Sequence, residues 1–509
     1  MSLTQKASNY FTTNSIIALC AIGIVSFIIK MTIFPYGIPV TEDGLFYFRY
    51  AVDTSILGQL PETPISNNGW PLFLSLFFSV FHSDNFLDYM TIQRLLTVSL
   101  STLTIIPVYL LAKRFVESKY AILTAFLFAL EPRTIQNSLL GISESMYILL
   151  VTLGLVFCLS SRRNLVYLSF SIVALAVQVR YEGIFLFFVL TIMFFVRNKK
   201  ERKTIGRYLI ALCIFLLTML PFSYVKIATS GSETTTDGLI SGAQVYGIEA
   251  SSNQETYGVL KYILTGIQAL VKFLGLVMVP FFIFLTPIGA LLVLRKKEKG
   301  GIMLVVTIVL LSIPALYAYS RGIQEGRYLY VLYPVFSVLA VLAIQAFQKR
   351  IRRIVIIIVI AAIASSMAFL SVKSVDYDHE REAFEIAKHV SSTTKVINQY
   401  YPESRYIRVT AMEGHFPVLS KEVSFGPKIL SPGYNTMKEF IESNRGEGLD
   451  HVVADDRPYR QEFLKDAFYN AEKYPFLIKE FDSKETGFEY HVKIYKIDYD
   501  RFDLSKSEQ

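Results

Sequence analysis

The stretch KRIRRIVIIIVIAAIASSMAFL, residues 349–370, decides the fold class. Four basic residues lie within its first five positions, and the 17 residues that follow, up to Leu370, carry no charge. A helix of about this length can cross most of the roughly 30 Å of hydrocarbon in a bilayer. Basic residues next to a span stay on the cytoplasmic side. The stretch therefore predicts a helix that leaves the cytoplasm, with the rest of the chain outside.

The composition of the whole chain also indicates a membrane protein. Of 509 residues, 52% are hydrophobic and 18% are charged, and the mean hydropathy is +0.42. Soluble proteins carry roughly 25% charged residues. The net charge of +8 is uneven, because residues 373–509 hold 20 Lys and Arg against 25 Asp and Glu. We predict a transmembrane domain over residues 1–372 and a soluble, extracytoplasmic α/β domain over residues 373–509.

The same counts exclude several kinds of site. The pI near 9.0 reflects basic loops facing anionic lipid, so no nucleic-acid partner is expected. The three cysteines, Cys20, Cys158 and Cys213, all lie in apolar runs, which leaves no disulfide framework or zinc cluster. Five of the six histidines are scattered through the last 137 residues. We therefore predict no metal site and no required cofactor, although a divalent metal is compatible with the sequence.

Ten further apolar runs extend the prediction to about eleven transmembrane helices. The first is a retained anchor, since no cationic segment precedes it and no cleavage site follows it. The predicted spans are Ser15–Phe34, Ile92–Ala112, Tyr120–Thr134, Met146–Ser160, Leu165–Val179, Ile184–Val196, Tyr208–Val225, Phe273–Leu294, Ile302–Tyr319, Tyr328–Phe347 and Ile354–Leu370.

Orientation follows from the loops, because every second one is basic. The basic loops are Lys113–Lys119, Arg162–Arg163, Arg197–Arg207, Arg295–Lys299 and Lys349–Arg353. We expect a multi-pass protein of the cell membrane with a cytoplasmic N-terminus and an external C-terminal domain. The long first external loop, residues 35–91, contains an apolar stretch, Pro71–Phe81, expected to lie along the membrane interface as a helix. Residues 226–258 are polar and read as a flexible external loop.

The C-terminal segment shows both helical and strand periodicities, which predicts a small α/β domain. Two helices are expected over Glu380–Asn398 and Gln461–Tyr474, and three strands over Tyr406–Thr410, His451–Ala454 and Tyr490–Ile497.

Two adjacent carboxylates, Glu42 and Asp43, come just after the first span. When such a pair is partly desolvated, both groups cannot ionise freely, so one of them is able to accept a proton near neutral pH. The pair is therefore a candidate for a general base. The alternative is a solvated helix start, because Thr41-Glu-Asp also suits a helix N-terminus.

Further charged groups fall at the same predicted membrane face. Glu144 begins a span, Arg180-Tyr-Glu182 joins two spans, and Arg321 and Arg327 precede another. Arginines run against the charge bias of an external face, so they need anionic partners. Those partners are either a bound phosphate, which guanidinium recognises through two parallel hydrogen bonds, or the nearby carboxylates Glu144, Glu182 and Glu325.

The order of these motifs resembles the GT-C fold membrane glycosyltransferases. EDGLFYFRYA (42–51), Gly58 and NGWPLFL (68–74) are similar to the first external loop of the protein O-mannosyltransferase-like family, which includes the aminoarabinose and rhizobial lipopolysaccharide glycosyltransferases. Arg94-Leu, RYEG (180–183) and RYLYVLYP (327–334) fit later patterns, so the resemblance covers about residues 15–350. The pair is Glu-Asp where the mannosyltransferases usually have Asp-Glu, and Trp70, the only tryptophan, excludes a Trp-Trp-Asp motif.

The resemblance implies transfer of a single sugar from a polyprenyl-phosphate carrier to a hydroxyl of a protein, lipid or glycan outside the membrane, with inversion. Asp43 or Glu42 would be the base. The donor phosphate would meet Arg327, Arg180, Arg321 and Tyr328, while Glu144, Glu182 and Trp70 would contact the acceptor or sugar.

Two other classes of protein remain open. A transporter would keep ionisable groups near the middle of its spans, usually in repeated halves. Here the charged groups gather at the ends of spans. A structural or sensory protein would need no cluster of external arginines.

Overall fold

The computed structural model describes residues 12–40, 43–56, 58, 67–199, 203–230, 257–296, 298–348, 353–398, 406, 427–431, 433–458 and 460–507. The chain divides into two compact units. The first contains residues 1–34, 53–79 and 92–370, and the second contains residues 35–52, 80–91 and 371–509.

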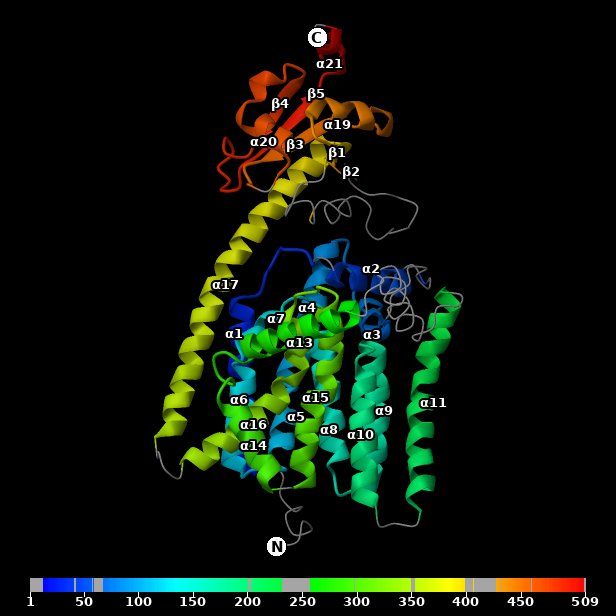
Figure 1. The fold of residues 1–509 in the computed structure, drawn as a ribbon, viewed down its shortest axis with the longest axis vertical. Coiled ribbons are helices and arrows are strands. Elements are labelled where there is room, and N and C mark those ends of the chain that lie inside the picture. Colours follow the sequence, from blue (N-terminus) through cyan, green and yellow to red (C-terminus); the bar gives the residue numbers. More distant parts are fainter. Residues whose placement is uncertain are drawn as a thin grey trace. The chain divides into compact units, whose positions relative to one another are not determined.

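The first unit is helical, as the apolar runs predict (Figure 1). Its elements are α1 (Thr13–Thr32), α3 (Gly69–Phe78), α4 (Phe86–Leu103), α5 (Ile105–Ala112), α6 (Ser118–Ala129), α7 (Pro132–Ser138), α8 (Glu144–Cys158), α9 (Arg163–Val179), α10 (Gly183–Asn198), α11 (Thr204–Ser230), α13 (Tyr257–Met278), α14 (Leu285–Lys296), α15 (Lys299–Ser320), η1 (Gly326–Leu332), α16 (Tyr333–Gln348) and the start of α17 (Ile354–Thr393). α4 begins in residues of the second unit. α2 (Asp43–Ser55) also lies mostly in that unit. Among the described helices, seven are long and apolar enough to cross a membrane, which confirms a polytopic helical protein.

Three predicted boundaries are wrong, and proline accounts for two of them. The predicted span Phe273–Leu294 is split between α13 and α14, because Pro280 lies between them and supplies no backbone N–H. The predicted span Tyr120–Thr134 ends early, since Pro132 begins the separate helix α7. The predicted loop 226–258 is also shorter, because α11 continues to Ser230 and α13 begins at Tyr257.

Helix α13 differs from its neighbours in direction. Figure 1 shows it lying crosswise to the upright helices α9, α10 and α15. It packs on α15 and on η1. Its other side leaves apolar side chains exposed, including Ile263, Leu264 and Val271. An amphipathic helix in this orientation suits a membrane interface.

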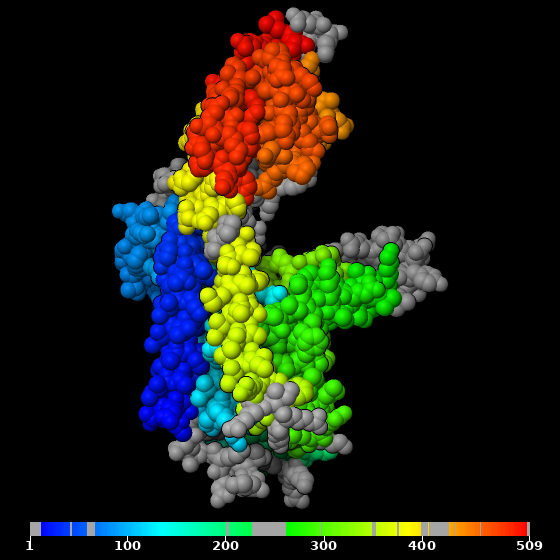
Figure 2. All heavy atoms as spheres, turned by 90° about the vertical axis from the view of Figure 1, so that its left-hand side faces the viewer, coloured from blue at the N-terminus to red at the C-terminus, as the bar shows by residue number. Residues whose placement is uncertain are grey.

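Long apolar faces are exposed on the outer helices of the first unit. On α1, drawn in blue in Figure 2, Ile17, Ile24 and Ile28 are each more than half exposed. On the membrane-spanning part of α17, Ile356 and Ile360 are exposed in the same way. Soluble proteins rarely expose contiguous apolar patches of this kind. These faces are therefore the ones expected to contact lipid.

The second unit contains a five-stranded mixed sheet in the order β2-β1-β3-β5-β4. The strands are β1 (Val396–Asn398), β2 (Lys428–Leu430), β3 (His451–Asp455), β4 (Leu477–Asp482) and β5 (Val492–Ile497). β1 pairs with β2 and β3 in parallel, and β5 pairs with β3 and β4 antiparallel. The helices are the end of α17, α19 (Met437–Asn444), α20 (Glu462–Tyr469) and α21 (Tyr499–Ser507).

Alternating residues of the sheet build one core on each face. Val452 and Tyr495 pack on one side with α19 and α20, including Phe440. Val453 and Ile494 pack on the other side with the end of α17. The second core also takes in Ile38 and Leu87, which lie in the segment 35–91.

The α/β character of the tail is confirmed, but several of its predicted elements are wrong. The helix predicted over Glu380–Asn398 is the end of α17, and its last three residues are strand β1. The helix predicted over Gln461–Tyr474 is shorter. α20 is capped at Asn470, and a short 3-10 turn follows. His451–Ala454 and Tyr490–Ile497 are found as β3 and β5. Tyr406 is helical, and 407–410 lie outside the described residues.

Candidate functional site

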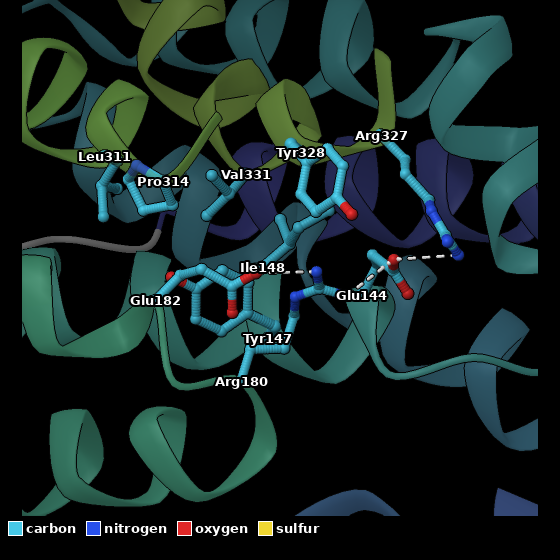
Figure 3. Close-up of a pocket in the computed structure, with 10 residues that line it drawn as sticks. All are labelled: Glu144, Tyr147, Ile148, Arg180, Glu182, Leu311, Pro314, Arg327, Tyr328 and Val331. Atoms are coloured by element: carbon cyan, nitrogen blue, oxygen red, sulfur yellow. Dashed lines mark hydrogen bonds and ion pairs between the residues drawn. The ribbon is translucent and has the colours of Figure 1, made fainter. Parts of the chain in front are cut away.

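A polar pocket in the first unit brings together four segments that are far apart in sequence (Figure 3). It is narrow, because the space open to the centre of a water molecule is only about 10 Å³. The segments are the start of α8, the loop between α9 and α10, the middle of α15, and η1. The lining residues are Glu144, Tyr147, Ile148, Arg180, Glu182, Leu311, Pro314, Arg327, Tyr328 and Val331.

The turn that precedes Glu144 is held by side chains of α3 and α4. Gly141 has a φ of 73°, a left-handed conformation that favours glycine. Its carbonyl oxygen accepts hydrogen bonds from the Gln93 amide at 2.7 Å and from the Trp70 indole at 3.3 Å. Arg94 Nε donates to the Leu139 carbonyl oxygen at 2.8 Å. These buried donors fix the position at which α8 begins, and Glu144 is its first residue.

The Arg180 loop is fixed by two close backbone approaches. A Cβ on Gly183 would lie 2.8 Å from the Val177 backbone nitrogen, and a Cβ on Gly69 would lie 2.7 Å from the Gln178 carbonyl carbon. Only glycine fits at such distances without movement of the backbone. α10 and α3 therefore both begin directly against the last turn of α9, and Arg180 follows that turn in extended conformation.

The guanidinium of Arg180 bridges two buried carboxylates. Nη1 donates to Glu144 Oε1 at 2.8 Å and Nη2 to Glu182 Oε1 at 2.9 Å (Figure 3). The side chains of Glu144 and Glu182 are 5% and 8% exposed. The Tyr328 ring lies 5.9 Å from the Arg180 guanidinium carbon, within cation–π distance. These ion pairs agree with the alternative from the sequence in which the arginines pair with nearby carboxylates. Phosphate binding is a separate question.

Arg327 reaches the same carboxylate from the opposite side. Its Nη1 lies 3.9 Å from Glu144 Oε1, and its Nε pairs with Glu325. Glu144 Oε1 therefore lies between two guanidinium groups (Figure 3). The second oxygens of Glu144 and Glu182 are buried, and neither has a hydrogen-bond partner among the described residues. Such acceptor atoms favour a ligand that brings hydroxyl donors.

The pocket excludes two of the residues predicted for it. Arg321 is exposed beside Tyr317, at 5.7 Å from that ring, and does not line the pocket. Trp70 is fully buried and supports the turn at Gly141 instead of facing the pocket. Asp43 is the first residue of α2, in the second unit, which also agrees with a helix N-terminus. Glu42 lies outside the described residues.

Sequence reasoning missed Tyr147 and a second arginine–carboxylate pair. Tyr147 lies one turn after Glu144, a spacing that could have indicated its place in the pocket. Glu131 is fully buried between α6 and α7, 3.7 Å from Arg133 Nη1, which donates to the Val279 carbonyl oxygen at 2.5 Å. The signal for this pair was Glu131-Pro-Arg133 at the end of an apolar run.

Solved structures with a similar fold define the class. ArnT from Cupriavidus metallidurans bound to undecaprenyl phosphate matches with a TM-score of 0.57 and 9% identity, over 96% of this chain and 98% of that one. The Archaeoglobus fulgidus oligosaccharyltransferase with zinc and sulfate matches with a TM-score of 0.56 and 13% identity, over 85% and 68%. The oligosaccharyltransferase AglB from Archaeoglobus fulgidus, in complex with an inhibitory peptide and a dolichol-phosphate, matches with a TM-score of 0.53 and 14% identity, over 93% of this chain and 74% of that one. The fold is thus the GT-C fold of membrane glycosyltransferases, as the sequence motifs predicted.

The sequence itself places the chain more narrowly. The profile of DUF2079, described as a predicted membrane protein, matches residues 90–403. The chain therefore belongs to the DUF2079 family. No curated protein matches the sequence.

Proposed function

We propose that this protein transfers a single sugar from a polyprenyl-phosphate donor to an acceptor hydroxyl on the outer face of the membrane. The observation that carries the proposal is the half-buried cluster of Arg180, Glu144 and Arg327 where helices end in a GT-C fold. A lipid-linked substrate needs such a site, because its tail stays in the bilayer while its phosphate lies at the interface. The transmembrane domain, 1–372, would hold the site, and the domain 373–509 would lie outside the membrane.

The donor phosphate is assigned to Arg327, Arg180 and Tyr328. Arg327 is 25% exposed and its contact with Glu144 is long, at 3.9 Å, so a phosphate could replace that contact while Nε keeps its pair with Glu325. Arg180 would contribute mainly its charge, since its two nitrogens already donate to carboxylates. Arg321 does not line the pocket, so it could contact the donor phosphate only at the edge of the pocket. The relatives support this class of ligand, because one structure of each was solved with a polyprenyl phosphate.

The sugar or acceptor hydroxyls are assigned to Glu144 and Glu182. Each has one oxygen on Arg180 and a second, buried oxygen with no hydrogen-bond partner among the described residues. A hydroxyl that donates to that oxygen would satisfy it, and a ligand without the hydroxyl would leave it unsatisfied. Discrimination between sugars therefore depends on where their hydroxyls fall. Trp70 would support this contact only through the turn that holds Glu144.

Catalysis is assigned to Asp43, with Glu42 as its partner. The acceptor oxygen attacks the anomeric carbon and forms the new glycosidic bond, while its proton passes to the carboxylate. The bond from the anomeric carbon to the phosphate oxygen breaks, and the phosphate keeps the electron pair. Direct attack inverts the anomeric configuration. Arginine stabilises the charge that develops on the phosphate, so this step needs no metal.

An assay with membranes that contain the protein and labelled polyprenyl-phosphate sugars tests the proposal. We expect the label to move from the lipid phosphate to an acceptor. Movement of a small solute across the membrane with no loss of label from the lipid would instead support a transporter.

The loop charges predict an external C-terminus. A reporter that is active only outside the cytoplasm, fused after Gln509, should be active, and the same reporter placed after Lys200 in a basic loop should be silent. Labelling of the C-terminal domain from the cytoplasmic side would contradict both this topology and the position of the proposed site.

Arg327 provides a test of donor binding. Arg327→Ala should weaken binding of polyprenyl phosphate by about 10- to 100-fold, because a charged hydrogen bond contributes roughly 1.5–3 kcal/mol. Arg327→Lys should recover only part of the affinity, since an ammonium keeps the charge but loses the planar fork. Arg163→Ala, at an exposed position of α9, is the control and should bind normally. Unchanged affinity with a large loss of thermal stability would make Arg327 a structural partner of Glu325 and Glu144.

A further inference from the structure

Three side chains of the second unit form a cluster that the proposed reaction does not use. His379 and Glu382 lie on α17, and Glu489 lies in the turn between β4 and β5. One ligand atom from each residue lies within 4.8 Å of those of the other two. His379 Nδ1 and Glu489 Oε2 are 3.7 Å apart. A histidine nitrogen and two carboxylate oxygens, from elements about 110 residues apart, are thus already gathered at one point.

The backbone around the cluster is held in place by other contacts. His379 and Glu382 are three residues apart and share one face of the helix. The Tyr490 backbone N–H donates to Glu382 Oε1 at 2.6 Å, which ties the turn to α17 and orients that carboxylate. Lys484 Nζ donates to the Glu489 carbonyl oxygen at 2.8 Å and closes the turn. Among the described residues, no group donates a hydrogen bond to the second oxygen of Glu382 or to the carboxylate of Glu489.

Within the described residues, no neighbouring lysine or arginine neutralises the negative charge of Glu382 and Glu489. Nearby acids on α17 have basic partners, since Asp376 pairs with Lys373 at 2.6 Å and Glu385 pairs with Lys388 at 2.8 Å. Within the described part of the chain, no Lys or Arg lies at ion-pair distance from Glu382 or Glu489. Two carboxylates held close to each other without a cation repel, and a bound cation would relieve that repulsion.

We propose that His379, Glu382 and Glu489 bind a divalent transition-metal ion of the Zn²⁺ type. An imidazole and two carboxylates suit Zn²⁺, which takes three protein ligands with water in the remaining position. Around a tetrahedral ion with bonds of about 2.0–2.2 Å, the ligand atoms lie about 3.4 Å apart. Rotations of the three side chains that move each ligand atom by about 1 Å bring the atoms to this spacing. The bound ion would join α17 to the β4–β5 turn and stabilise the second unit.

Zn²⁺ titration of the full chain in detergent, followed by calorimetry, tests the site. We expect His379→Ala and Glu489→Gln each to weaken binding by at least 10-fold, the loss that changing even an indirect partner of a metal ligand produces. His491→Ala is the matched control. His491 lies in the same hairpin, but its Nε2 is bonded to Asp482 at 2.9 Å, so this variant should bind Zn²⁺ normally. Co²⁺ provides a second readout, because its visible absorption should disappear in the same two variants.

Two controls separate this site from misfolding and from the pocket. In EDTA, His379→Ala and Glu489→Gln should unfold at nearly the temperature of the unchanged protein, and Zn²⁺ should raise the unfolding temperature only where the site is intact. Asp43→Asn should leave Zn²⁺ binding unchanged, so failure of the proposed transfer reaction would not affect this result. Failure of the full chain to bind Zn²⁺, or equal binding by His379→Ala and Glu489→Gln, would overturn the proposal.

Discussion

Replacement of Asp43 by asparagine is expected to lower sugar transfer by about 10²–10⁴-fold, the usual loss when a general base is removed. Asparagine keeps the shape of the side chain and its place in the first turn of α2, but it cannot take the proton of the acceptor hydroxyl. Donor binding and the unfolding temperature should change little. The measurement is initial transfer rate at saturating donor, beside donor affinity.

Asp88→Asn is the matched control for this prediction. Asp88 also lies in the first turn of a helix, but it accepts a hydrogen bond from the Ser83 hydroxyl at 2.6 Å and so serves a local role. Its asparagine variant should transfer sugar at a normal rate. If Asp43→Asn keeps near-normal turnover, the base must be sought at Glu42, whose Gln variant completes the comparison.

Replacement of Arg180 by methionine is expected to cost about 3–5 kcal/mol of stability, because it leaves the buried Glu182 without its cation and Glu144 with only the 3.9 Å contact to Arg327. Methionine retains much of the length of the arginine stem, so lost packing is a smaller contribution. Thermal unfolding in detergent measures the effect. Arg162→Met, at the exposed opposite end of α9, should change the unfolding temperature very little.

A second variant separates charge from shape at this position. In Arg180→Met with Glu182→Gln, one uncompensated carboxylate is gone, so part of the lost stability should return. The two changes should therefore be less than additive, as expected for residues in contact. An Arg180→Met protein that unfolds at the unchanged temperature would show that the ion pairs with Glu144 and Glu182 contribute nothing to folding.

The apolar pattern predicted most of the helices well. α1, α8, α9, α10 and α15 begin and end within a few residues of their predicted positions, because each is a mostly apolar run bounded by charged or turn-forming residues. The errors came from a proline inside an apolar run and from a helix that continues beyond the end of its apolar run. Pro280 lies inside an unbroken apolar run, so hydropathy alone could not separate α13 from α14. The sequence predicted a span ending at Leu370 and a separate helix from Glu380, yet α17 continues through both to Thr393.

The residues that line the pocket could be predicted only in part from the sequence. Glu144, Arg180, Glu182 and Arg327 were selected because charge at a helix end in a membrane is costly, and Tyr328 through the family resemblance; the structure places all five around one pocket. That rule could not distinguish Arg321, which has a similar position in sequence but remains exposed. It also misassigned Trp70, because a tryptophan beside the site has the same sequence signature whether it contacts a ligand or supports a turn. Tyr147 carries no charge and was invisible to it.

The core of the second unit, which combines Ile38 with Ala383, Phe384 and Val390, has a consequence for biosynthesis. Ile38 leaves the ribosome well over 300 residues before these partners do. At about 5–20 residues per second, the early segment waits roughly 20–70 s for them. The β-sheet that follows cannot complete its packing until translation is nearly finished. A fragment that starts at Ser371 would be translated without Ile38 and Leu87, and would lack the part of this core that they supply.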